Sequence, residues 1–135
     1  MKYFVIAAAI MLLSLTAYAG KEEREFMKSE VVPAVKKAEA EFKKACGCGL
    51  SFTVNSNLKS TDEMRQARNV ANAVAEGAPK HCTDADSRKA MCALKSLEVT
   101  KAKESTFTFK GGKGTATTDG QSFVGWEMIT REVDK

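Results

Sequence analysis

The stretch KKACGCGL, residues 43–50, joins an expected helix to an expected strand and holds two of the four cysteines of the chain. Gly47 is a typical helix stop, because glycine readily adopts the left-handed conformation that ends many helices. Cys46 and Cys48 lie on either side of it. These two sulfur atoms can be metal ligands, a redox pair or halves of two disulfides, and the choice decides how much of the function can be inferred.

An even number of cysteines in a short chain indicates a disulfide framework, here formed by Cys46, Cys48, Cys82 and Cys92. A helix expected over 83–95 would hold Cys82 and Cys92 roughly 15 Å apart, whereas a disulfide requires Cα atoms within about 7 Å. This argues against 82–92 and against its strained partner bond 46–48. Two pairings remain open: 46–92 with 48–82, and 46–82 with 48–92. Each bond closes a loop of about 35–45 residues, worth roughly 4 kcal/mol in the chain-entropy description.

A metal or thiol-redox centre is the alternative for the same part of the chain. Cys46, Cys48, His81 and Cys82 would supply three thiolates and one imidazole, a ligand set that suits zinc or Cu(I). The spacing fits neither the usual zinc patterns nor the Cys-x-x-Cys motif of thiol oxidoreductases. We therefore expect structural disulfides, with no metal and no cofactor.

The first 19 residues have the features of a secretory signal peptide. Lys2 gives a positive start, residues 4–15 are apolar except for one serine, and Ala17-Tyr18-Ala19 fits the cleavage rule. The apolar run is shorter than the roughly 20 residues that a membrane span needs. We expect cleavage before Gly20, a bacterial protein, and a periplasmic or extracellular location with no membrane span after cleavage.

Composition indicates one small domain over residues 20–135. The net charge of +4 falls to +3 when the one lysine of the leader is removed (4 − 1). This mild charge argues against a dedicated nucleic-acid binder, for which a clustered basic face is typical. With two prolines and no Gly/Ser-rich linker, nothing marks a second domain.

Hydrophobic periodicity predicts helices in the first two thirds of the chain. A helix over 21–45 carries an apolar stripe, and Pro33 predicts a kink within it. A half-buried strand is expected at 50–55. Ser60 followed by Glu63 is a capping box that opens a second helix, which Gly77 and Pro79 are expected to end. The third helix is the one expected over 83–95.

From residue 97 onward, hydrophobic residues recur at every second position, which indicates strands. Strands are expected at 97–100, 107–110, 115–118 and 122–132, with GGKG at 111–114 as a tight hairpin turn. Helices early and strands late predict an α+β fold: a kinked N-terminal helix and two shorter helices packed on an antiparallel β-meander and stapled by disulfides.

No recognisable catalytic constellation is present, so we expect a protein that is not an enzyme. GGKGT at 111–115 lacks the spacing and the strand-to-helix context of a phosphate-binding loop. His81 is the only histidine, and no nucleophile elbow accompanies it. A small hydrolase that uses His81 is the remaining catalytic alternative.

The leading hypothesis is a small exported, non-catalytic binding module: an inhibitor, a toxin-neutralising protein or an accessory protein. Its expected partner is a protein or an anionic component of the cell envelope, bound at the hairpin edge of the sheet. Lysines on an edge strand also have a purely structural use, since they discourage strand-on-strand association. The candidate partner-binding residues are Lys101, Lys103, Lys110, Lys113 and Trp126.

Overall fold

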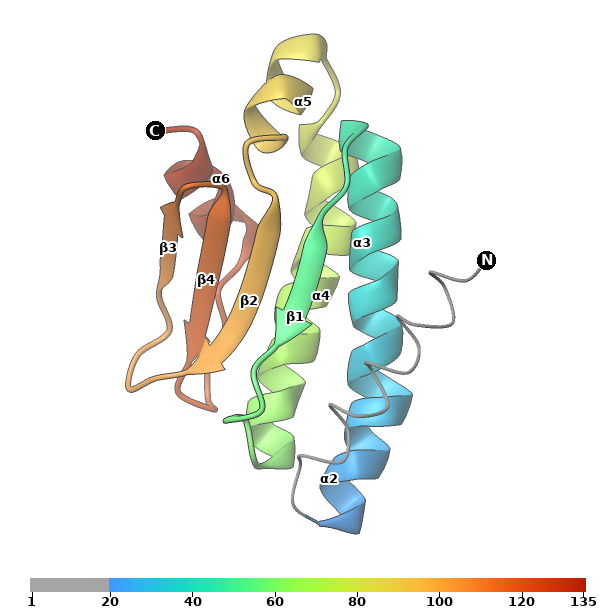
Figure 1. Cartoon of the computed structure of the whole chain (residues 1–135), viewed down its shortest axis with the longest axis vertical. Coiled ribbons are helices and arrows are strands. Elements are labelled where there is room, and N and C mark those ends of the chain that lie inside the picture. Colours follow the sequence, from blue (N-terminus) through green and yellow to red (C-terminus); the bar gives the residue numbers. More distant parts are fainter. Residues whose placement is uncertain (1–19) are drawn as a thin grey trace.

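A computed structural model describes residues 20–135 of the chain as two layers, a four-stranded sheet and a set of helices that cover one of its faces (Figure 1). The expected signal peptide, residues 1–19, lies outside the described residues. The fold is α+β, as predicted, and two disulfides cross-link it.

The first helical segment runs without interruption through α2 (Lys21–Phe26), η1 (Met27–Val31) and α3 (Val32–Cys46). The expected kink at Pro33 is not confirmed. Proline lacks an N–H and crowds the carbonyl four residues upstream, which here belongs to Ser29. Ser29 lies in η1, a π-helical segment with a wider turn, and this irregularity accommodates Pro33 inside a continuous helix.

Helix α4 (Thr61–His81) begins at the predicted capping box. The Ser60 hydroxyl accepts a hydrogen bond from the Glu63 N–H at 3.1 Å, and the Glu63 carboxylate accepts one from the Ser60 N–H at 3.1 Å. The box satisfies two N–H groups that a helix start otherwise leaves without partners.

The predicted end of this helix at Gly77 and Pro79 is wrong, because α4 continues to His81. Gly77 and Ala78 are buried against neighbouring elements, and Cys82 directly after the helix is disulfide-bonded. Burial and the cross-link outweigh the weak local preference of glycine and the single hydrogen bond that Pro79 removes.

Helix α5 (Ala85–Met91) is shorter than the helix expected over 83–95 and starts two residues later. Its N-cap is Asp84, whose carboxylate accepts the Ser87 N–H at 2.7 Å. The helix ends at Met91, and Cys92 follows immediately.

The sheet contains β1 (Ser51–Val54), β2 (Ser96–Lys101), β3 (Phe107–Lys110) and β4 (Lys113–Thr118), in the spatial order β1-β2-β4-β3. The predicted antiparallel meander is wrong: β1 pairs with β2 and β2 with β4 in parallel, and only β3 and β4 are antiparallel. Parallel neighbours need a crossover connection, which α4 and α5 supply between β1 and β2.

The hairpin between β3 and β4 is as predicted. Gly111 and Gly112 form the two-residue turn with φ of 59° and 84°, so both positions need the left-handed region that glycine tolerates. Lys110 and Lys113 pair across the turn.

The predicted strand at 122–132 is wrong, because helix α6 (Trp126–Val133) occupies this segment. Ile129 and Val133 are buried four residues apart, which is the helical spacing. Over so short a segment, apolar residues fit a strand and a helix almost equally well.

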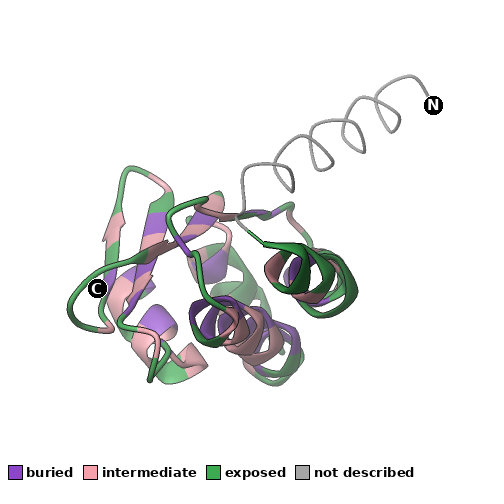
Figure 2. Ribbon diagram, turned by 90° about the horizontal axis from the view of Figure 1, so that it is seen from below, coloured by how far each residue is buried: buried purple, intermediate pink, exposed green. Residues whose placement is uncertain are grey.

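The core lies between the inner face of the sheet and the helices, where Figure 2 shows the buried residues. Leu97 and Val99 of β2 face it and are fully buried. On β4 the matching positions are small, Gly114 and Ala116, and a Cβ at Gly114 would meet the Phe107 ring at 2.6 Å. The small residues of β4 therefore leave the space that the aromatic side chain of β3 fills.

A Gly77→Ala substitution tests the packing of α6 on α4. Alanine normally favours a helix over glycine by up to about 1 kcal/mol. Here a Cβ would overlap the Trp126 indole ring, so we expect a loss of about 1–3 kcal/mol in the free energy of unfolding, measured with urea.

Gly49→Ala is the control, since a Cβ there meets nothing within 4 Å. In a Trp126→Ala background, Gly77→Ala should become neutral or stabilising. If Gly77→Ala destabilises the protein equally with and without Trp126, this packing contact is not the cause.

Candidate functional site

The two disulfides bring the ends of several elements together. Cys46 bonds to Cys82 with 5.2 Å between their Cα atoms, and Cys48 to Cys92 with 5.9 Å. This is one of the two pairings that the sequence left open. Gly47, with φ of 81°, ends α3 as predicted and lies between the two cross-links. We call this part of the molecule, residues 42–49, 78–95 and 110–113, the stapled end.

The disulfides use the sulfur atoms that a metal or free-thiol centre would need. Cys46, Cys48, Cys82 and Cys92 are all paired, and residues 20–135 contain no cluster of metal-ligating side chains. The ring of His81 lies edge-on to Trp126, with 5.9 Å between ring centroids, and its Nε2 is 3.8 Å from Asp134. The histidine thus contributes to the packing of α6 on α4.

Intact mass of the natural protein tests this pairing directly. Without reduction, we expect a mass four hydrogens below that of the reduced chain and no alkylated thiols. Removing either bond with a pair of alanines should lower the free energy of unfolding by about 2–4 kcal/mol. Four alkylated thiols, or a stoichiometric metal, would contradict the disulfide pairing and favour a metal or thiol-redox centre.

Lys110 and Lys113 are the two candidate residues that the structure brings together. They flank the β-turn, and the N–H of Lys95 donates to the Gly112 carbonyl of the same turn at 2.7 Å. Three exposed lysines therefore surround the hairpin tip. Lys113 approaches the Glu98 carboxylate at 3.7 Å, a loose and exposed contact that stabilises the protein little.

Lys101 and Lys103 lie at the opposite end of the sheet. Because β2 runs parallel to β4, Lys113 lies beside Ser96 at the start of β2, while Lys101 is its last residue. Five residues of strand separate the two ends by about 17 Å. The Lys101 ammonium group is also engaged, with its Nζ 2.8 Å from the Glu63 carboxylate. The four lysines thus do not form one surface.

Trp126 begins α6 and is half-buried against Gly77 and His81. Among the aromatic side chains of residues 20–135, the exposed one is instead Phe123, 43% accessible, in the loop that precedes α6.

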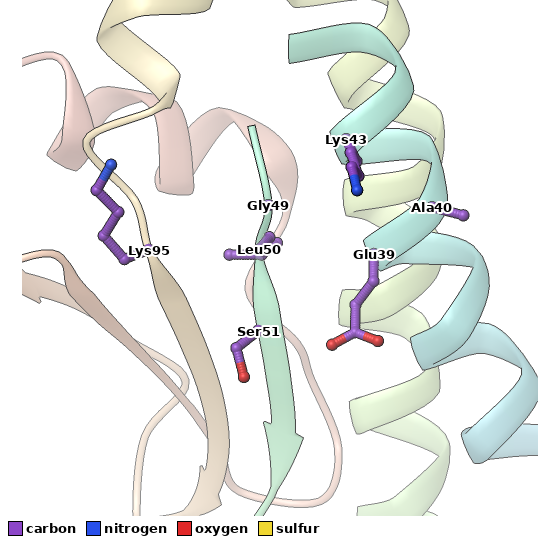
Figure 3. A pocket seen from close by; sticks show the side chains of 7 residues that line it. All are labelled: Glu39, Ala40, Lys43, Gly49, Leu50, Ser51 and Lys95. Carbon is purple, nitrogen blue, oxygen red and sulfur yellow. The ribbon is translucent and has the colours of Figure 1, made fainter. Parts of the chain in front are cut away.

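An open cavity of about 560 Å³ lies between α3 and β1. Figure 3 shows Glu39 and Lys43 extending from α3 on one side of it, Lys95 on the other, and Leu50 and Ser51 of the β1 region between them. The Glu39 carboxylate accepts the Phe52 N–H at 2.9 Å. Burial raises the pKa of Glu39, and this effect outweighs the Phe52 hydrogen bond and the nearby Lys36 charge, which lower it.

Sequence reasoning did not identify Lys43, Lys95 or Glu39 as parts of a site. Lys43 and Lys95 are 52 positions apart (95 − 43) and meet at one cavity only because α3, β1 and β2 converge at the stapled end. No local pattern signals such a meeting. The disulfide pattern alone indicated that 46–48 and 82–92 lie close together.

Comparison with known proteins gives no family for this chain. No protein-family model matches it, and no curated protein or solved structure is significantly similar to it. Within residues 20–135, no helix has both the length and the apolar composition that crossing a membrane requires. The two disulfides are compatible with an exported protein, since such bonds persist in oxidising compartments.

The pH dependence of stability should reveal the role of Glu63. Its burial alone would raise the pKa, but hydrogen bonds from Lys101, Ser60 and Lys59 together hold the pKa of Glu63 below its usual value. The charged form therefore stabilises the fold above the pKa of the unfolded chain, and this contribution disappears as the pH falls through the folded pKa. We expect Glu63→Gln to lose about 1–2 kcal/mol at neutral pH and little in acid, measured by urea unfolding.

Glu39→Gln is the matched comparison, because its carboxyl pKa moves the other way. Glutamine keeps an acceptor for the Phe52 N–H and removes a charge that burial disfavours. Unfolding of this variant at neutral pH should need at least as much urea as that of the natural protein. If Glu63→Gln and Glu39→Gln lose equal free energies of unfolding at neutral pH, the pKa values of the two carboxyls are not shifted in opposite directions.

Proposed function

We propose that this chain is an exported, non-catalytic binding module that attaches to an anionic component of the cell envelope through its stapled end. The observation that carries the proposal is the convergence of Lys43, Lys95, Lys110 and Lys113 around one cavity and one hairpin tip. All four side chains are exposed. Phosphate or carboxylate groups of a polymer or lipid surface are the chemistry that such a cluster attracts.

The charge distribution supports this choice of surface. The stapled end carries eight cationic side chains: Lys43, Lys44, Lys80, Arg88, Lys89, Lys95, Lys110 and Lys113. Only two acidic residues belong to it, Asp84 at the N-cap of α5 and Asp86 in its first turn. Glu39, which lines the cavity, and Glu98, which approaches Lys113, lie just outside its residue ranges. The net charge of the whole chain is only +4, so the rest of the molecule carries an excess of acidic residues. A mild total charge therefore conceals a strongly basic end.

Structural uses account for part of this cluster. Basic residues in the last turns of α3 and α4 interact favourably with the helix dipoles. That explanation does not extend to Lys95, which directly precedes β2, or to Lys110 and Lys113, which end β3 and begin β4. These three are the residues whose exposure a binding role explains best.

Binding to anionic surfaces can be measured with residues 20–135 in the oxidised state. The probes are vesicles of phosphatidylglycerol mixed with phosphatidylcholine, and soluble polyphosphate. We expect salt-sensitive binding that falls at least about tenfold in Lys95→Glu/Lys113→Glu, because each lysine near an anionic surface contributes about 1 kcal/mol.

The control is Lys28→Glu/Lys37→Glu, which changes the net charge equally but on the exposed side of the long N-terminal helix. This variant should lose much less affinity. Equal losses in the two variants would mean that only net charge matters, and no binding to either probe would contradict the proposal.

A further inference from the structure

The two edges of the sheet differ in how their backbone groups are satisfied. At the β1 edge, the Glu39 carboxylate accepts the Phe52 N–H. At the other edge, β3 pairs with β4 alone among the described strands. The β1 edge therefore has a backbone N–H that a side chain occupies, whereas β3 has no described strand on its outer side.

The register of the hairpin identifies the open groups. Thr106 and Thr117 are a hydrogen-bonded pair, since the Thr117 N–H donates to the Thr106 carbonyl at 2.8 Å. Such pairs alternate along an antiparallel ladder, so Thr108 and Lys110 also bond to β4. Phe107 and Phe109 then present one N–H and one C=O each to the open edge.

Aromatic surface accompanies these open backbone groups. The Phe109 side chain is only half-buried. Exposed Phe123 follows Ser122, whose carbonyl accepts the Ser105 hydroxyl at 3.1 Å, which places Phe123 near the start of β3. Residues 106–109, TFTF, are uncharged and strongly strand-forming.

We propose that the β3 edge is a homodimer interface in which β3 of one copy pairs antiparallel with β3 of a second copy. A twofold axis between the two Thr108 residues makes Phe107 of each copy exchange two hydrogen bonds with Phe109 of the other. The four open groups of each copy are then satisfied, and the two sheets become one sheet of eight strands.

Charge complementarity favours a second copy as the occupant. In this register Lys110 lies opposite Thr106 of the other copy, next to its Glu104. Within the described residues neither Lys110 nor Glu104 forms an ion pair, and both are exposed. The twofold axis forms the Lys110–Glu104 contact twice, which is the self-complementarity that an isologous interface requires.

The assembly stops at two copies. Pairing uses both β3 edges, and the remaining β1 edges are those capped by Glu39. A closed dimer rather than a filament follows from this difference between the edges.

Sedimentation equilibrium of oxidised residues 20–135 at increasing concentration tests the dimer. We expect a monomer–dimer equilibrium, and hydrogen exchange of the Phe107 and Phe109 amides that slows as the dimer forms. Thr108→Lys sets two lysines opposite each other on the axis and should raise the dissociation constant at least about fivefold. Thr53→Lys, on the same exposed face but at the β1 edge, should not change it.

A charge swap tests the register. Glu104→Lys and Lys110→Glu should each weaken the dimer, and the double variant should recover most of the loss. A monomer at every concentration would overturn the proposal. So would a dimer that neither Thr108→Lys nor the single charge changes affect. Lys110 belongs both to this register and to the stapled end, but the binding test replaces Lys95 and Lys113 and measures attachment to anionic probes, whereas this test measures self-association, so each proposal can fail without the other.

Discussion

The two disulfides, Cys46–Cys82 and Cys48–Cys92, are the constraint that accounts for the parallel direction of β1 and β2. Cys48 precedes β1 by three residues and Cys92 precedes β2 by four, and their bond holds the two starting points together. Two strands that leave the same cross-link side by side run the same way. The parallel pairing of β1 and β2 therefore follows from the disulfide, with α4 and α5 forming the crossover that parallel strands need.

The parallel pairing of β1 and β2 could have been predicted from the positions of the cysteines, but the sequence analysis did not use them in this way. Either of the two open disulfide pairings holds 46–48 against 82–92, so parallel pairing of the strands that follow could have been derived. The meander was expected instead because strand order was read along the chain alone. The capping box at Ser60, the stop at Gly47 and the Gly111-Gly112 turn were predicted correctly, since each depends on a few neighbouring residues. Local signals failed at Gly77 and Trp126, where the packing of α6 on α4 decides the conformation.

The residues of the candidate site also fall into those that local sequence could place and those that only the tertiary fold brings together. Lys110 and Lys113 flank a local turn, so sequence could place them together. Lys101 and Lys103 looked close to them along the chain, but the parallel β2–β4 pairing sends them to the far end of the sheet. Lys43 and Lys95 join the hairpin only through the tertiary fold. The expectation of export depends on residues 1–19, which lie outside the part of the chain that the structure describes.

The two proposed surfaces constrain each other geometrically. Antiparallel pairing of β3 points the two hairpin tips in opposite directions, so a dimer carries its basic stapled ends at opposite ends of one long sheet. Such a dimer cannot place both stapled ends on one flat membrane at the same time. It therefore gains no avidity from binding a single flat surface. It suits an anionic polymer that passes both ends, or two facing surfaces that the dimer bridges. The Glu39 carboxylate contributes to the same arrangement, because it accepts the Phe52 N–H at the β1 edge and so occupies a donor to which a further copy would otherwise bond.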